Sequence, residues 1–159
     1  MGDFALVGAA FAFGIGSALL PVLLNAELYV GGNAALVSES IIIVVVLSLS
    51  VGTVIGKAIV FELARKGRKV VGRGVRRPTS NRWILTLRSV SDWLLGLLDR
   101  PYAGGLTVLA SSLFGVPPLA VVTIAAGVSH QSRYLFLTIV FLGRTAQFLV
   151  IAFVVGKVL

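Results

Sequence analysis

The sequence predicts an all-α integral membrane protein: an inverted repeat of a re-entrant helical hairpin plus a transmembrane helix, with an amphipathic interfacial helix between the halves. Three observations lead to this prediction. The 159-residue chain is 57% hydrophobic and 13% charged, which is more apolar surface than a soluble domain of this length can bury. Its long uncharged stretches are interrupted by glycine and proline. Nine of its 14 Lys and Arg residues fall between Arg65 and Arg88.

This basic window contains no acidic residue, whereas the first 39 residues contain three acids and no base. Such a block can mark a nucleic-acid-binding surface. Between membrane segments it more often marks the cytoplasmic side, where it meets anionic lipid head groups. We therefore expect a multi-pass protein of the cell membrane, the inner membrane in a bacterium, and no nucleic-acid partner. Without cysteine there is no disulfide or thiolate metal site, and the acidic start MGDF argues against a secretory signal peptide.

The first hairpin is expected in residues 4–38. Residues 4–26 are 23 uncharged positions, enough for one helical crossing, but residues 28–38 add only 11 more. The segment is either a full span followed by a half-helix or a re-entrant hairpin turning between Pro21 and Gly31. We favour the hairpin, because broken backbone is tolerated at membrane depth where protein covers it. Asn25 and Glu27 lie in this turn, and an ionisable group at such depth is costly, which makes Glu27 the leading candidate for a functional residue.

The first transmembrane helix is expected to begin at residue 40 and to reach spanning length by continuing to Leu63. Gly52 and Gly56 lie four positions apart, a spacing that lets another helix approach closely. Lys57 either extends its amine to the membrane interface or belongs to a site.

A basic loop is expected from Arg65 to Asn81, because glycines and Pro78 break any regular element there. Residues 82–100 follow as an amphipathic helix, with apolar side chains at three- and four-residue steps. Its two tryptophans suit a membrane interface, so we expect this helix on the cytoplasmic leaflet.

The second hairpin is expected in residues 101–132, which are 32 uncharged positions with Pro117-Pro118 in the middle. Two adjacent prolines remove two backbone donors and prevent a straight helix. Arg100 and Arg133 flank the hairpin and place both of its ends on the cytoplasmic side. Residues 134–156 form the last span, in which Arg144 is the only charge.

The two halves share a pattern. In each, a glycine follows a proline by ten positions, at Pro21–Gly31 and Pro117–Gly127. In each, the following span contains a glycine followed directly by a base and, four positions after the base, a phenylalanine. The first span has Gly56, Lys57 and Phe61 in these positions, and the second has Gly143, Arg144 and Phe148. The hairpin and span glycines are 25 residues apart in the first half and 16 in the second, and we assign the difference to a longer loop near residues 38–40.

This repeat divides the single domain into three parts: residues 4–63, the basic loop and amphipathic helix in residues 64–100, and residues 101–157. If the basic loop is inside, the first hairpin enters from outside and the second from inside. The halves are then related by an axis in the membrane plane, as in inverted-repeat transporters, whose sites lie where broken helices meet near the midplane.

These motifs resemble those of the DedA-type, VTT-domain membrane family, also called SNARE-associated. That family has a proline-rich turn ending in glutamate, similar here to Pro21, Asn25, Ala26 and Glu27. A second family motif, G-x-x-x-G-D-x-x-x-Y-x-x-G-R, is similar to the positions Gly52, Gly56, Lys57, Phe61, Ala64 and Arg65. The chain departs from the family at Lys57, where the family has an acid, at Phe61, where it has tyrosine, and in the second hairpin, which has no arginine.

The resemblance implies lipid translocation, as a flippase or scramblase of a polyprenyl-phosphate carrier or a phospholipid. We expect a substrate and proton site made of Glu27, Asn25, Lys57, Arg144 and Arg133, with membrane lipids of anionic head group as partners. Two alternatives stay open: Glu27 is only one half of a structural ion pair, or the protein is a small non-transporting membrane protein, either a pore former such as a phage holin or an assembly partner. Proton coupling and a homo-oligomer are compatible with the sequence. No enzyme chemistry, cofactor or metal is expected, since no nucleophile set or ligand cluster is present.

Overall fold

The computed structural model describes residues 2–20, 23–34, 36–71 and 82–158, and structural statements below refer to these residues. This part of the chain consists of helices and their connections, with no strand, so the all-α prediction is confirmed for it. The helices are α1 (Gly2–Leu19), α2 (Ala26–Ala34), α3 (Glu39–Val71), α4 (Arg82–Leu98), α5 (Pro101–Phe114), α6 (Leu119–Val128) and α7 (Arg133–Val158).

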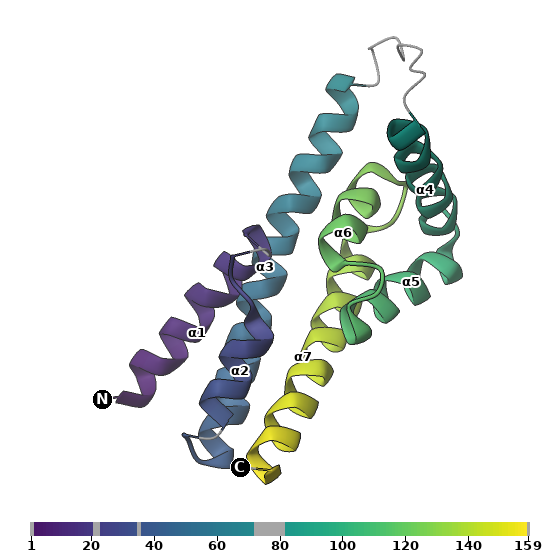
Figure 1. The fold of residues 1–159 in the computed structure, drawn as a ribbon. Helices are drawn as coiled ribbons and strands as arrows, with labels where there is room; N and C mark the ends of the chain where they lie inside the picture. Colours follow the sequence, from purple (N-terminus) through teal and green to yellow (C-terminus); the bar gives the residue numbers. More distant parts are fainter. Residues whose placement is uncertain (1, 21–22, 35, 72–81, 159) are drawn as a thin grey trace.

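Two helices are long and apolar enough to cross a membrane: α3, over 30 residues from Glu39 to Arg68, and α7, over 26 residues. At about 1.5 Å per residue these helices are about 45 and 39 Å long, more than the hydrocarbon thickness of roughly 30 Å. They contact each other and run in opposite directions (Figure 1).

Helix α3 is longer than the sequence predicted. Its last turns, from Arg65 to Val71, fall in the segment expected to be a loop, so that prediction is wrong for these seven residues. A single glycine, Gly67, costs an exposed helix only about 1 kcal/mol, and nothing lies within 4 Å of the position its Cβ would take. Residues 72–81 of the expected loop lie outside the described residues.

The unequal spacing of the repeat also has its origin in α3. The connections before α3 and α7 have equal length, residues 35–38 and 129–132. Gly56 stands 17 positions after the first residue of α3, whereas Gly143 stands ten after that of α7. The spacing between the hairpin glycine and the span glycine is nine residues longer in the first half than in the second, and seven of these nine residues belong to helix α3. The prediction of a longer loop near residues 38–40 is therefore wrong.

The first hairpin, α1 and α2, lies against one half of α3. The Ser48 hydroxyl donates to the carbonyl of Val7 at 2.9 Å, and farther along both helices the Lys57 amine donates to the carbonyl of Ala18 at 3.2 Å. Helix α1 thus runs parallel to α3 and ends near the middle of it. Helix α2 returns alongside α7, and the Glu27 carboxylate at its start meets Arg144.

The second hairpin, α5 and α6, repeats this arrangement with the long helices exchanged. Helix α5 packs on α7, and α6 packs on α3 (Figure 1). Helix α5 ends at Phe114 and is capped by Gly115, which has a φ of 72°, a left-handed conformation that favours glycine. The peptide bond before Pro117 is cis, and Pro118 precedes the first residue of α6.

Glycines lie where these helices approach most closely. A Cβ at Gly52 or Gly56 would collide with the backbone or an alanine of α1, and one at Gly143 would collide with a serine of α5. A Cβ at Gly127 would come within 2.5 Å of the Phe61 carbonyl oxygen. The hairpins are therefore seated on the long helices by direct backbone contact.

The apolar core is divided into two clusters at opposite ends of the long helices. Leu49 of α3 and Phe148 of α7 belong to the first cluster, and Phe61 of α3 and Val140 of α7 belong to the second. On α3 the polar residues Thr53 and Lys57 lie between the two clusters. On α7 Arg144 lies between Val140 of one cluster and Phe148 of the other. The only two bases in the middle thirds of α3 and α7 thus lie between two buried apolar clusters.

Polar contacts hold the turn between α6 and α7. Arg68 donates to the carbonyl of Val128 at 2.7 Å, and Arg65 donates to that of Gln131 at 2.8 Å. On the other side, the backbone N–H of His130 donates to the Asp99 carboxylate at 3.0 Å, which holds the pKa of Asp99 below its usual range.

Candidate functional site

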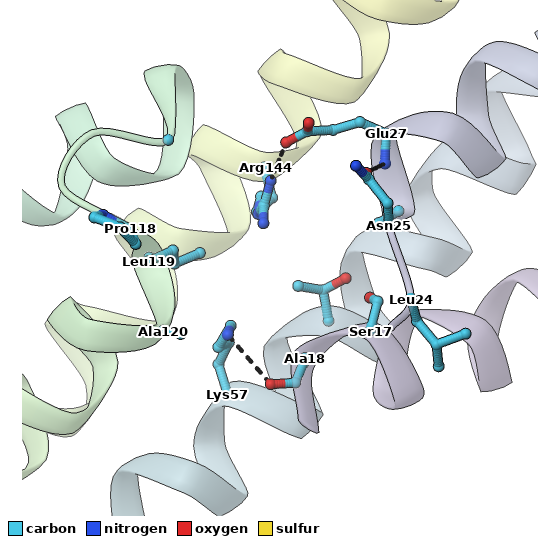
Figure 2. Close-up of a pocket in the computed structure, with 13 residues that line it drawn as sticks. Ser17, Ala18, Leu24, Asn25, Glu27, Lys57, Pro118, Leu119, Ala120 and Arg144 are labelled. Carbon is cyan, nitrogen blue, oxygen red and sulfur yellow. Dashed lines mark hydrogen bonds and ion pairs between the residues drawn. The ribbon is translucent and has the colours of Figure 1, made fainter. Parts of the chain in front are cut away.

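A cavity of about 240 Å³ lies where the tips of the two hairpins face each other. It contains three charged side chains, each from a different helix (Figure 2). Its lining consists of Ser17, Ala18, Leu24, Asn25, Ala26, Glu27, Thr53, Lys57, Gly115, Pro118, Leu119, Ala120 and Arg144. Residues from both hairpin tips and both long helices therefore meet in one space.

Glu27 is positioned by the first turn of α2. The Asn25 side-chain oxygen accepts the backbone N–H of Glu27 at 2.9 Å, so Asn25 caps the helix. Glu27 then stands in the first helical turn, where exposed N–H groups favour a negative charge. The local sequence Asn-Ala-Glu thus provides both the start of α2 and a carboxylate held at that start.

The Glu27 carboxylate is bound by two groups of α7. Arg144 Nη1 lies 3.3 Å from Glu27 Oε1, and Gln147 Nε2 donates to the same oxygen at 3.0 Å. Arg144 also donates to the side-chain oxygen of Gln147 at 2.6 Å, which closes a triangle of contacts. The Glu27 side chain is 42% exposed and that of Arg144 is 16% exposed, so the carboxylate remains accessible to the cavity while the guanidinium is mostly covered.

Lys57 is the most deeply buried charge of the site, with 2% of its surface exposed. Its amine donates to the carbonyl of Ala18 in the last turn of α1, where unpaired carbonyls favour a positive charge. An ammonium group has three donors, and this is the one hydrogen bond recorded for it among the described residues. Figure 2 shows Lys57 and Arg144 entering the hollow from different helices.

The sequence-predicted site residues are brought together only in part. The cavity gathers Asn25, Glu27, Lys57, Arg144 and Pro118. Arg133 is not among its lining residues: it begins α7, 11 positions or about 16 Å before Arg144, and pairs with Glu62 of α3 at 3.2 Å. Pro21 lies outside the described residues.

The other hairpin residues serve packing positions. Gly31 faces α7, with Val155 at 4.0 Å from the place of its Cβ, and Gly127 contacts α3. Pro117 accepts the Ser111 hydroxyl at its carbonyl, at 2.6 Å, which closes the second tip.

Sequence reasoning missed Gln147 as a member of the site. It stands three positions after Arg144 in the second repeated signature, and residues three apart share a face of a helix. That spacing was available as a signal. The polar wall made by Ser17 and Thr53 was missed as well, because neither carries a charge, and both hydroxyls donate to carbonyls of their own helices.

The described residues contain no group of three or more His, Cys, Asp or Glu side chains arranged to hold a metal ion. The charged side chains that line the cavity are two bases and one acid. No family model, curated protein or solved structure matches this chain.

Proposed function

We propose that this protein is an integral membrane transporter that lets the phosphate-bearing head group of a lipid cross the bilayer while the hydrocarbon tails stay in the surrounding lipid. The observation that carries the proposal is the charged cavity midway along α3 and α7, bounded by the tips of two helical hairpins. Ionisable groups buried at membrane depth are expensive and are characteristic of substrate or ion pathways.

The dimensions of the short helices support a re-entrant arrangement. Helix α2 has nine residues and α6 has ten, so at about 1.5 Å per residue each covers 14–15 Å, half of a hydrocarbon layer of roughly 30 Å. A helix of that length that packs on a spanning helix ends near the bilayer centre. Irregular backbone at the two tips is compatible with that depth because it lines a cavity.

The exchange of partners between the hairpins supports an inverted repeat. In each half the first hairpin helix packs on that half's own long helix, and the second packs on the long helix of the other half. The long helices run in opposite directions (Figure 1). This is the geometry expected when an axis in the membrane plane relates the halves, and it also supports the proposed likeness to the DedA-type, VTT-domain family.

The orientation we propose places the end of α3 that carries Arg65, Lys66 and Arg68 in the cytoplasm, by the positive-inside rule. The turn between α2 and α3 is then external. Single cysteines at Lys66 and Leu36, both exposed, test this with an impermeant thiol reagent on intact cells. Labelling of the Lys66 position, or protection of the Leu36 position, contradicts the orientation.

Transport is tested with the purified protein in liposomes that contain a fluorescent phospholipid or a short-chain polyprenyl phosphate together with an entrapped ionic dye. The proposal predicts movement of the lipid head group with retention of the dye. Release of the dye without lipid movement would instead identify the pore former considered as the alternative. Empty liposomes and the Glu27→Gln variant serve as controls.

A further inference from the structure

The last turns of α3 continue the helix beyond the part that packs closely on α6. Helix α6 approaches α3 at Phe61 and Ala64, which a Cβ at Gly127 would meet. Residues 65–71 follow, and four of these seven residues are bases with one glycine among them. Glycine weakens a helix, and so do like charges at neighbouring positions on its surface. The helical state of this segment therefore depends on contacts with the rest of the fold.

These contacts go to the turn between α6 and α7. Arg65 donates to the carbonyl of Gln131 at 2.8 Å. Arg68 donates twice, from Nη1 to the carbonyl of Val128 at 2.7 Å and from Nη2 to His130 Nε2 at 3.2 Å. Two of the three acceptors are backbone carbonyls, which do not titrate. The third belongs to the only histidine of the chain, and histidine is the side chain whose charge ordinarily changes between about pH 5 and 8.

The contacts of His130 determine which ring nitrogen carries the proton. A guanidinium group can only donate, so Nε2 accepts from Arg68 and carries no proton. The proton of the neutral ring is therefore on Nδ1, which lies 3.3 Å from the Asp99 carboxylate. Asp99 also accepts the backbone N–H of His130, which lowers the pKa of Asp99 and keeps it ionised in this pH range. The neutral imidazole thus has an acceptor at one nitrogen and a donor at the other.

We propose that Asp99, His130 and Arg68 form a pH-dependent contact that holds the last turns of α3 on the turn between α6 and α7 only while the imidazole is neutral. Protonation places an N–H on Nε2, which lies 3.2 Å from a guanidinium that cannot accept it. The two groups then also repel each other as like charges, so this contact opens. The contact of His130 with Asp99 gains charge and stays closed. Acid therefore releases the end of α3, while the turn remains bound at the end of α4.

Other charged side chains in the adjoining parts of α3, α4 and α7 do not take the place of His130 in this titration. Glu62 of α3 pairs with Arg133 of α7 at 3.2 Å, and Arg65 is bound to a carbonyl. Carboxylates, lysines and arginines ordinarily titrate outside the range of about pH 5 to 8. The sequences of α5 and α6 contain no charged residue after Arg100. The remaining charged side chains described in these parts are exposed, and they are Lys66, Asp92 and Arg100.

The first test is hydrogen exchange of residues 65–71, followed by mass spectrometry on the full chain in zwitterionic nanodiscs at about pH 8 and pH 5. After correction for the intrinsic exchange rate, we expect protection to fall about fivefold in acid, the effect of losing roughly one hydrogen bond. His130→Gln keeps an acceptor that does not titrate and should retain protection at both pH values. Arg68→Met removes the donors and should lose protection at both. Lys66→Met is the matched control, since it removes an exposed base from the same turns and should leave the pH dependence unchanged.

The second test reads the imidazole directly. Because the chain has one histidine, nitrogen-15 labelling of histidine gives the resonances of His130 alone. We expect the proton on Nδ1 at about pH 8 and protons on both nitrogens at about pH 5. A proton on Nε2 at the higher pH overturns the inference, as does protection of residues 65–71 that is equal at both pH values or that still falls in acid in His130→Gln. The inference goes beyond lipid transport and does not depend on it, because neither measurement involves movement of lipid.

Discussion

The substitution Glu27→Gln tests whether the Glu27 carboxylate takes part in lipid transport or only forms an ion pair that stabilises the fold. Glutamine keeps the length of the side chain and an oxygen that can accept from Arg144 and Gln147, which now lie 3.3 and 3.0 Å away. The substitution removes the negative charge of the acceptor, which strengthens these two hydrogen bonds by about 1 kcal/mol. A loss of that size in a chain of 159 residues lowers the melting temperature by about 2–4 °C. We expect a folded variant in which lipid transport is abolished.

A purely structural ion pair predicts a different result. Removing one partner of a fully buried pair costs about 3–5 kcal/mol, because the other charge is stranded. The Glu27 side chain is 42% exposed, so water can reach the site and the cost is smaller. If Glu27→Gln nevertheless lowers stability by several kcal/mol, and a second change of Arg144 to glutamine restores it, then the pair serves only to hold the hairpin.

The measurement is a thermal-unfolding and transport series on the two single variants and the double variant in the same nanodiscs or liposomes. Glu39→Gln is the matched control, since it removes an exposed carboxylate from the first turn of α3. Full transport activity in Glu27→Gln would refute the reasoning, because it would remove this carboxylate from the transport cycle altogether.

Three further predictions concern the fold. Gly127→Ala brings a Cβ within 2.5 Å of a carbonyl of α3 and should cost about 1–3 kcal/mol in unfolding assays, whereas Gly8→Ala, which meets nothing within 4 Å, should cost nothing. Replacing Pro117-Pro118 by two alanines should join α5 and α6 into one helix, and a cysteine at Ser132 would then become labelled from the opposite side; unchanged labelling contradicts the re-entrant hairpin. The backbone N–H of His130 lowers the pKa of Asp99 in the folded state. The ionised Asp99 therefore stabilises the fold above its unfolded-state pKa, and this stabilisation is lost as the pH falls through the folded-state pKa. The Asp99→Asn variant should accordingly show a smaller change of melting temperature between pH 6 and 3 than the unsubstituted protein.

Much of the fold could be predicted from local sequence. The positions of the helices follow from uncharged runs, and their ends follow from local signals: Asn25 before α2, and Pro101 in the first turn of α5. The end of α3 could not be predicted in this way. Glycine and a run of bases suggested a loop, but residues 65–71 continue the helix, in which Arg65 and Arg68 bind the carbonyls of the turn after α6.

The candidate site was partly predictable because charged residues are rare within the apolar stretches of this chain. Glu27, Lys57 and Arg144 stand out for that reason alone. Their pairing could not be read from sequence, since either base could have reached Glu27, and only the packing of α2 on α7 selects Arg144. Arg133 was assigned to the site by charge, but its place at the start of α7 brings it to Glu62 instead.

The tip of the first hairpin joins the two long helices at mid-length. Ala18 at one side of it accepts a hydrogen bond from Lys57 of α3, and Glu27 at the other side accepts from α7. Helix α1 is held to α3 by the hydrogen bonds of Ser48 and Lys57 and by the close approach of Gly52. If α7 slid along α3 by about 1.5 Å, the rise of one helical residue, α1 would stay with α3 and the 3.3 Å contact between Arg144 and Glu27 would leave hydrogen-bond range. The first hairpin, which packs on both long helices, therefore helps to keep α3 and α7 in axial register.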